Sequence, residues 1–137
     1  MSRLQSPALL AARLLMSLIF ITAGWSKISG YAGTQQYMEA MGVPGALLPL
    51  VILTELGGGL LILVGFQTRL AALLLAGFSL ASGLLFHYVA AQAATDAAVA
   101  SAQMINFWKN VTIAGGFLAL FAAGAGAWSV DGRRGRA

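Results

Sequence analysis

The chain has 137 residues, of which 59% are hydrophobic and only 9% charged, and its mean hydropathy is +0.84. This composition excludes an ordinary soluble domain, in which about a quarter of the residues are charged, and predicts a membrane protein with a single domain over residues 1–137. The chain has no cysteine, which excludes thiol chemistry and thiolate metal ligands, and its net charge of +4 lacks the basic stripe with interleaved aromatic residues that would indicate nucleic-acid binding.

The first apolar run is too long for the core of a signal peptide, so we expect a retained membrane span over about residues 7–27. Arg13 lies near the start of this span, and we expect its side chain to extend to the lipid headgroups. Trp25 and Lys27 mark the opposite membrane surface. Lys27 then either reaches the headgroups or binds a ligand.

Residues 28–46 are polar enough to leave the membrane core, and we expect a short helix over 34–40. Tyr37, Met38 and Met41 lie at helical neighbour spacing, which gives this helix one apolar face. A helix with one apolar face can lie in two positions. The helix either rests on the membrane interface or forms a lid over the bundle.

The second span, residues 47–66, contains one carboxylate, Glu55, in a run of apolar side chains. At about 1.5 Å of rise per residue, Glu55 lies about 12 Å from the start of the span. A charged group at such a depth costs about 2.5–3.5 kcal/mol unless it faces protein, water or a partner charge. Glu55 is therefore a candidate functional residue, although a structural interhelical ion pair is the alternative. Close helix contact is the expected role of Gly57–Gly59.

A short turn with Arg69 leads into the third span, residues 70–91. Gly77 and Ala81 form a pair of small residues four apart, a pattern typical of helix contact surfaces. His87 lies near the end of this span. It is either a hydrogen-bonded interfacial histidine or a functional base, and as the chain's only histidine it cannot form a bis-histidine haem site.

Residues 92–103 are small and polar and predict a connecting loop, and the fourth span is expected over 106–128. Its opening turns carry three polar side chains that share one helix face: Asn106, Lys109 and Asn110. Farther along, three small residues form a ridge that would let a neighbouring backbone come close: Gly115, Ala119 and Ala123.

The distribution of basic residues predicts the orientation. Arg69 and the arginines near both chain ends lie at one surface, whereas the loops at the other surface carry Glu39 and Asp96. By the positive-inside rule both termini are cytoplasmic, and Arg69 is a topology determinant. Because every connection is short, the sequence predicts an all-α, up-down-up-down bundle of four transmembrane helices.

In this topology all four helices direct polar groups into the outer half of the bundle. We predict a cluster in which Glu55 and His87 are the candidate catalytic residues. The candidate ligand-binding residues are Lys27, Asn106, Lys109 and Asn110. One histidine with one glutamate makes a poor metal site, and no strand–glycine–helix unit exists for a nucleotide, so neither a metal nor a nucleotide is predicted.

Several segments together resemble the DoxX family of small bacterial inner-membrane proteins, especially its enterobacterial members, which implies a location in a bacterial inner membrane. They are ITAGWSKISGY at 21–31, MGVPG at 41–45, LTELGGGLLILVGFQTR at 53–69, LLFHY around His87, NFWKNVTIAGGFLAL at 106–120 and WSVD at 128–131. The resemblance covers about Leu14 to Asp131. It implies a four-helix membrane protein and, for some relatives, a place in quinone-linked redox assemblies such as thiosulfate:quinone oxidoreductases or complexes with soluble detoxification enzymes.

Two classes of function remain open. In the first, the protein is a redox subunit that binds a quinone, with His87 or Lys109 donating hydrogen bonds to its oxygens and Glu55 relaying a proton. In the second, it is a non-catalytic scaffold for a partner enzyme, or a small transport subunit that would have to form homo-oligomers.

Overall fold

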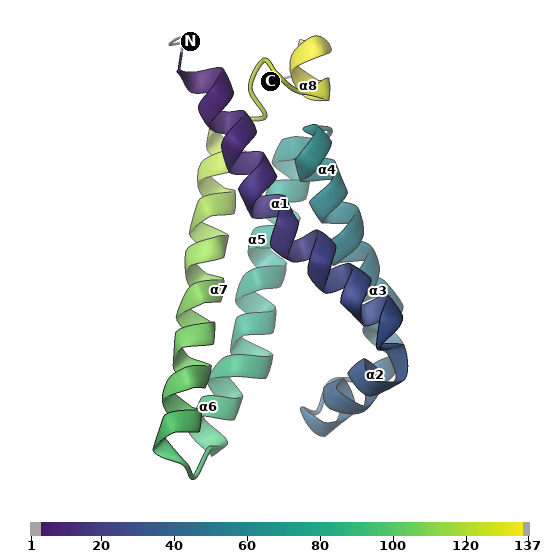
Figure 1. Ribbon diagram of the computed structural model, residues 1–137, viewed down its shortest axis with the longest axis vertical. Coiled ribbons are helices and arrows are strands. Elements are labelled where there is room, and N and C mark those ends of the chain that lie inside the picture. Colours follow the sequence, from purple (N-terminus) through teal and green to yellow (C-terminus); the bar gives the residue numbers. More distant parts are fainter. Residues whose placement is uncertain (1–3, 136–137) are drawn as a thin grey trace.

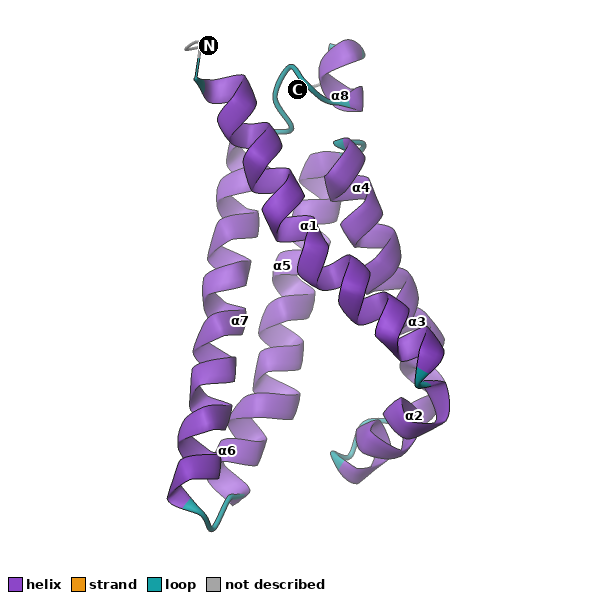
Figure 2. Ribbon diagram, in the orientation of Figure 1, coloured by secondary structure: helices purple, strands orange, loops and turns teal. Residues whose placement is uncertain are grey.

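The computed structural model describes residues 4–135, and within that range all regular structure is helical (Figures 1 and 2). Three helical stretches are long and apolar enough to cross a membrane: Gln5–Ser29, Gly45–Val64 and Thr68–Ala93. Their bounds agree with those of the predicted spans 7–27, 47–66 and 70–91 to within about two residues at each end. The prediction of an all-α membrane protein is thereby confirmed.

The first stretch is helix α1 (Gln5–Ser29), which leads into the short helix α2 (Tyr31–Ala40). The second runs without interruption through η1 (Gly45–Leu47), α3 (Leu48–Ile52), the π-helical turn η2 (Leu53–Gly57) and α4 (Gly58–Val64). The third comprises α5 (Thr68–Ser82), a second π-helical segment η3 (Gly83–Tyr88) and α6 (Val89–Ala93).

Helix α7 (Ala97–Ala123) has 27 residues, so its length also suffices to cross a bilayer. It is not one of the three stretches that are both long and apolar enough, and polar residues occupy its middle turns, so its crossing stays a prediction. It begins earlier than expected, since Asp96 caps it by accepting a hydrogen bond from the Val99 amide at 3.0 Å. The prediction of a loop over 92–103 was therefore wrong for its second half.

The helices are arranged as a splayed bundle. Helices α5 and α7 lie side by side and antiparallel, while α1 crosses in front from the top of α7 to the foot of α3 (Figure 1). The start of α1 and the short helix α8 (Val130–Arg133) lie at the same end. At the other end α1 and the second stretch diverge from the third stretch and α7, and α2 lies below α1 and α3.

The core lies where the helices are closest. Phe20 on α1 packs edge-on against Phe117 of α7, with ring centroids 5.4 Å apart. The remaining buried core residues come mainly from α5 and α7: Ile62, Ala71, Ala72, Leu75, Ala76, Ala114 and Leu120. Alanine predominates because α5 and α7 pack closely along their length.

Of the three glycines predicted for close helix contact, Gly59 lies against α1 and Gly58 against α5, whereas Gly57 meets only Leu53 of its own stretch, at 3.6 Å. A Cβ on Gly59 would lie 2.9 Å from Cγ1 of Ile21, and one on Gly58 would lie 3.0 Å from Leu75. The small-residue contact surfaces predicted around Gly77 and Gly115 do not pack against another described helix of this chain. Neither Gly77 nor Gly115 has a described neighbour within 4 Å of a Cβ added there, so these small residues face outward instead of packing within the chain.

Arg13 does not extend to the headgroups, which corrects the expectation from the sequence. Its side chain is 1% exposed and donates hydrogen bonds to the carbonyl oxygens of Leu63, at 3.1 Å, and Trp128. The end of α4 and the segment between α7 and α8 supply these carbonyls inside the protein, in place of the lipid headgroups. Arg13 thus connects α1 to the end of α4, through Leu63, and to the segment before α8, through Trp128.

Asp131 completes this end of the bundle. Its carboxylate accepts hydrogen bonds from the backbone amides of Gln67, at 3.0 Å, and Thr68, at 2.8 Å, and so caps the start of α5. The contact explains why residues 124–131 leave the α7 axis: Gly124 and Gly126, at φ 82° and 80°, turn the chain back over the bundle. The fourth helix therefore ends at Ala123 and not at the expected 128.

Arg69, predicted as a topology determinant, also has a structural contact. Its Nη1 donates to the carbonyl oxygens of Phe121, at 2.6 Å, and Ala122, at 3.0 Å, at the C-terminal end of α7. A cation there also complements the helix dipole.

Candidate functional site

A cavity of about 480 Å³ lies in the splayed half of the bundle. This volume is within the roughly 300–1,000 Å³ typical of sites for small organic ligands. Its walls come from α1, α2, the second stretch, the third stretch and α7, and they are mostly apolar. Five of the six predicted site residues line it: Lys27, Glu55, His87, Lys109 and Asn110.

Glu55 and Lys27 form an ion pair across one wall of the cavity. The Nζ atom of Lys27 lies 3.1 Å from Oε1 and 2.8 Å from Oε2 of Glu55. The Glu55 side chain is 8% exposed and that of Lys27 is 26% exposed. Lys27 therefore turns toward the protein instead of reaching for the headgroups, and the pair satisfies the carboxylate that the second span carries into the membrane.

His87 belongs to a separate group on the opposite wall. Its Nδ1 atom lies 2.9 Å from Oε1 of Gln103 on α7. An amide oxygen only accepts hydrogen bonds, so this contact fits the tautomer with its proton on Nδ1.

Lys109 and Asn110 lie beside that group on α7. The Nζ atom of Lys109 donates to Oδ1 of Asn106 at 2.9 Å, and Nδ2 of Asn110 lies 3.4 Å from the hydroxyl of Ser82. Asn106 does not itself line the cavity and acts through Lys109.

The single cluster expected from the sequence is therefore divided. In residues 4–135, Lys27 is the side chain that pairs with Glu55, and neither His87 nor Lys109 hydrogen-bonds to it. The two groups lie on different walls because α1 and η2 pack together, whereas η3 packs against α7. The cavity separates an anion–cation pair from an imidazole and a second amine.

Both candidate catalytic residues lie in π-helical segments, Glu55 in η2 and His87 in η3. A π turn inserts one extra residue into a helix and rotates the following side chains relative to the preceding ones. Such turns occur often at functional sites. Here each one places a titratable side chain on the wall of the same cavity.

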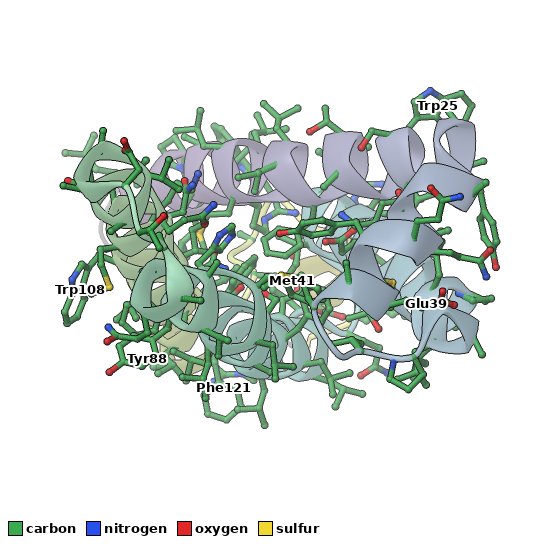
Figure 3. All side chains as sticks on the ribbon, turned by 90° about the horizontal axis from the view of Figure 1, so that it is seen from below. Trp25, Glu39, Met41, Tyr88, Trp108 and Phe121 are labelled. Atoms are coloured by element: carbon green, nitrogen blue, oxygen red, sulfur yellow. The ribbon has the colours of Figure 1, made fainter. Side chains whose placement is uncertain are left out.

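An aromatic pair forms part of the boundary of the cavity. Tyr37 on α2 stacks on Phe86 of η3, with ring centroids 5.7 Å apart and planes 23° apart. Thr34, Tyr37 and the buried Met38 all line the cavity, so α2 covers part of it, as the lid alternative predicts. By contrast, the labelled Trp25, Trp108 and Tyr88 point away from the interior (Figure 3), as expected for residues at a lipid boundary.

Sequence reasoning missed several lining or supporting residues. Ser79, Ser82 and Phe86 lie at i, i+3 and i+7 on one face of the third stretch. This spacing, visible in the sequence, indicates that the three side chains share a face. Gln103 was assigned to a loop. Had the helix been extended back to Asp96, the spacing of Gln103, Asn106 and Asn110 would have placed them on one face.

The family model described as DoxX matches residues 8–88 of the chain. The chain is 56% identical to "Inner membrane protein YqjF" of Escherichia coli (strain K12) over 131 residues, covering 96% of the chain and 95% of that protein. It is 42% identical over 127 residues to "Inner membrane protein YphA" of the same organism, covering 91% and 89%. It is 34% identical over 67 residues to "Putative oxidoreductase CatD" of Bacillus subtilis (strain 168), covering 49% and 50%. No solved structure matches the chain.

Proposed function

The chain belongs to the DoxX family, and from this premise we propose that it is an inner-membrane subunit of a redox assembly whose cavity binds a quinone. The observation that carries the proposal is the Lys27–Glu55 ion pair on the wall of a largely apolar cavity, which faces the amine of Lys109 and the ring of His87. The oxidoreductase name of CatD supports the same class of function.

The residues present fit a quinone. The ring of a quinone is planar and apolar, and the stacked Tyr37 and Phe86 offer a flat aromatic boundary. Its carbonyl oxygens need hydrogen-bond donors, which Lys109 and Asn110 provide on the α7 wall and Lys27 on the other. A bound quinone supplies two-electron chemistry, with electrons delivered by a partner protein. Glu55 and His87 are the groups of this chain that can hold and pass the accompanying protons.

Replacing Glu55 with glutamine tests this proposal. The substitution keeps the shape of the side chain but removes the proton-carrying carboxylate and the charge that fixes the Lys27 amine. We expect at least a tenfold loss of quinone binding, which is about the value of a hydrogen bond to a charged group. Quinone recovered by lipid extraction and mass analysis of the purified protein measures this, together with the dissociation constant of an added quinone.

The matched control is Glu39→Gln, because Glu39 is exposed on α2 and does not line the cavity. Its quinone content should equal that of the unchanged protein. If neither the unchanged protein nor the control carries or binds quinone, the proposal is wrong.

The same ion pair also favours a second candidate, a non-catalytic scaffold in which Glu55 only holds α1 against η2. Glu55 is 6% exposed, as a structural pair would require. For a scaffold, Glu55→Gln would lower the melting temperature in detergent and leave the activity of the partner enzyme unchanged. Loss of activity at an unchanged melting temperature would reject the scaffold.

We further propose that α7 is a fourth membrane span and that both termini are cytoplasmic. The chain has no cysteine, so single cysteines can be introduced without removing native ones. Thr95 and Arg133 are exposed at opposite ends of α7 and its C-terminal extension. In right-side-out inner-membrane vesicles, an impermeant maleimide should label Thr95→Cys but should label Arg133→Cys only after detergent is added. Equal labelling of both in intact vesicles would contradict this topology.

A further inference from the structure

Along the bundle axis, the cavity is closed at one end and covered at the other. Toward the core, Phe20 and Phe78 both line it and pack edge-on, with ring centroids 6.4 Å apart. At the outer end, α2 places Tyr37 and Met38 against it, and Tyr37 reaches across to stack on Phe86. The open routes into the cavity are therefore its sides.

One side opens between the second and third stretches. These stretches pack together through α4 and α5 and diverge toward the outer end of the bundle (Figure 1). Four residues that line the cavity are also exposed here, Leu47 and Leu50 on the second stretch and Ala81 and Leu85 on the third. Leu50 is 60% exposed and Leu85 45%. All four are apolar, and we call the opening that they border the apolar slot.

The hydroxyl groups that line the cavity beside the apolar slot already have acceptors. Thr54 donates to the carbonyl oxygen of Leu50 at 2.8 Å, and Ser82 donates to that of Ser79 at 3.3 Å. Each hydroxyl thus bonds within its own helix. This side of the cavity offers a ligand mainly hydrocarbon contacts.

The other side, between α1 and α7, has a different character. Lys27 of α1 and Lys109 of α7 both line the cavity. The Lys27 amine pairs with Glu55, and Lys109 is exposed, with its amine bonded to Asn106. A hydrocarbon chain that passed between these two amines would displace water from charged groups, which is unfavourable. The two sides therefore suit different parts of a ligand.

We infer that the cavity takes a ligand with a long hydrocarbon chain, which leaves through the apolar slot into the bilayer. The polar ring then lies between the Lys27–Glu55 pair and Asn110. This inference rests on the proposed quinone function and narrows it to quinones that carry such a chain. Because lipid tails are as apolar as leucine, the slot adds little affinity. Its effect is to fix the direction in which the ring enters.

A photoreactive quinone locates the chain in the unchanged full-length protein. The probe is decylubiquinone with a diazirine in the part of the chain next to the ring. After illumination in detergent, mass analysis of peptides should find the label near Leu50 and Leu85, and excess decylubiquinone should abolish it. Label on Ile19 or Ile113, which line the cavity from α1 and α7, would overturn the inference.

Narrowing the slot gives a second measurement. Leu85→Trp should weaken the binding of decylubiquinone by about tenfold, as overpacking does, and leave the chain-free analogue ubiquinone-0 unaffected. The matched control is Ile19→Trp, because Ile19 also lines the cavity and is 44% exposed, but lies on α1. It should leave the ratio of the two dissociation constants unchanged. So should Leu74→Trp, which alters an exposed residue of α5 outside the cavity.

The outcomes separate this inference from the broader proposal. Equal weakening of both quinones by Leu85→Trp would place the ring at Leu85 and overturn the inference, while the quinone function would stand. Label that excess decylubiquinone does not abolish would mean that membrane lipid fills the slot, with the same consequence. Binding of neither quinone to the unchanged protein would overturn both. Circular dichroism of each variant shows that it is folded before the titration.

Discussion

Replacing Arg13 with methionine is expected to lower the free energy of unfolding by about 3–5 kcal/mol, the range observed when one partner of a buried charged contact is removed. The guanidinium bonds the carbonyl oxygens of Leu63 and Trp128, and Asp131 lies near enough to interact with it electrostatically. Methionine fills most of the space but leaves these carbonyls without their donor. The melting temperature in detergent should fall by several degrees.

The control for this prediction is Arg133→Met, which removes an exposed arginine from the same end of the bundle. It should change the melting temperature little, because exposed charges contribute about 0–1 kcal/mol. Equal effects of the two substitutions would show that net charge, and not the buried contacts of Arg13, determines the stability of this end.

The second large effect is expected at Gly24, where α1 touches the second stretch most closely. A Cβ there would lie 2.8 Å from Cβ and 2.9 Å from the backbone nitrogen of Leu56, so the helices must move apart. We expect Gly24→Ala to destabilise the protein by about 1–3 kcal/mol, as overpacking does. It should also weaken quinone binding, because Lys27 and Glu55 flank this contact.

Gly77→Ala is the matched control, since Gly77 lies in the middle of α5 with no described neighbour within 4 Å of an added Cβ. Alanine has a higher helix propensity, so this variant should be unchanged or more stable by up to about 1 kcal/mol. Thermal denaturation of both variants, with quinone titration, makes the comparison. A stable Gly24→Ala variant with normal binding would contradict the close-contact interpretation.

The sequence was sufficient for the features that depend on local pattern. Long apolar runs predict membrane helices because the bilayer sets their length, and Glu55 stands out because a charge within such a run needs a partner. The sequence also predicts a lysine amine beside Glu55, but it does not distinguish Lys27 from Lys109.

The features that escaped prediction depend on contacts between distant residues. Arg13 finds its acceptors 50 and 115 positions away, and no local pattern distinguishes a buried arginine from one that reaches the headgroups. The π turns at Glu55 and His87 follow from packing and leave no signature in residue type. The early start of α7 was missed because small residues are compatible with both a loop and a helix.

The contact between Arg13 and Trp128 also affects the order in which the protein can fold during its synthesis. Arg13 is synthesised 115 positions before Trp128, which supplies one of its acceptors. Until Trp128 is added, the nascent protein carries an arginine without its full set of partners. Completion of this buried contact is thus coupled to the synthesis of residue 128, and a chain truncated before Trp128 would lack it.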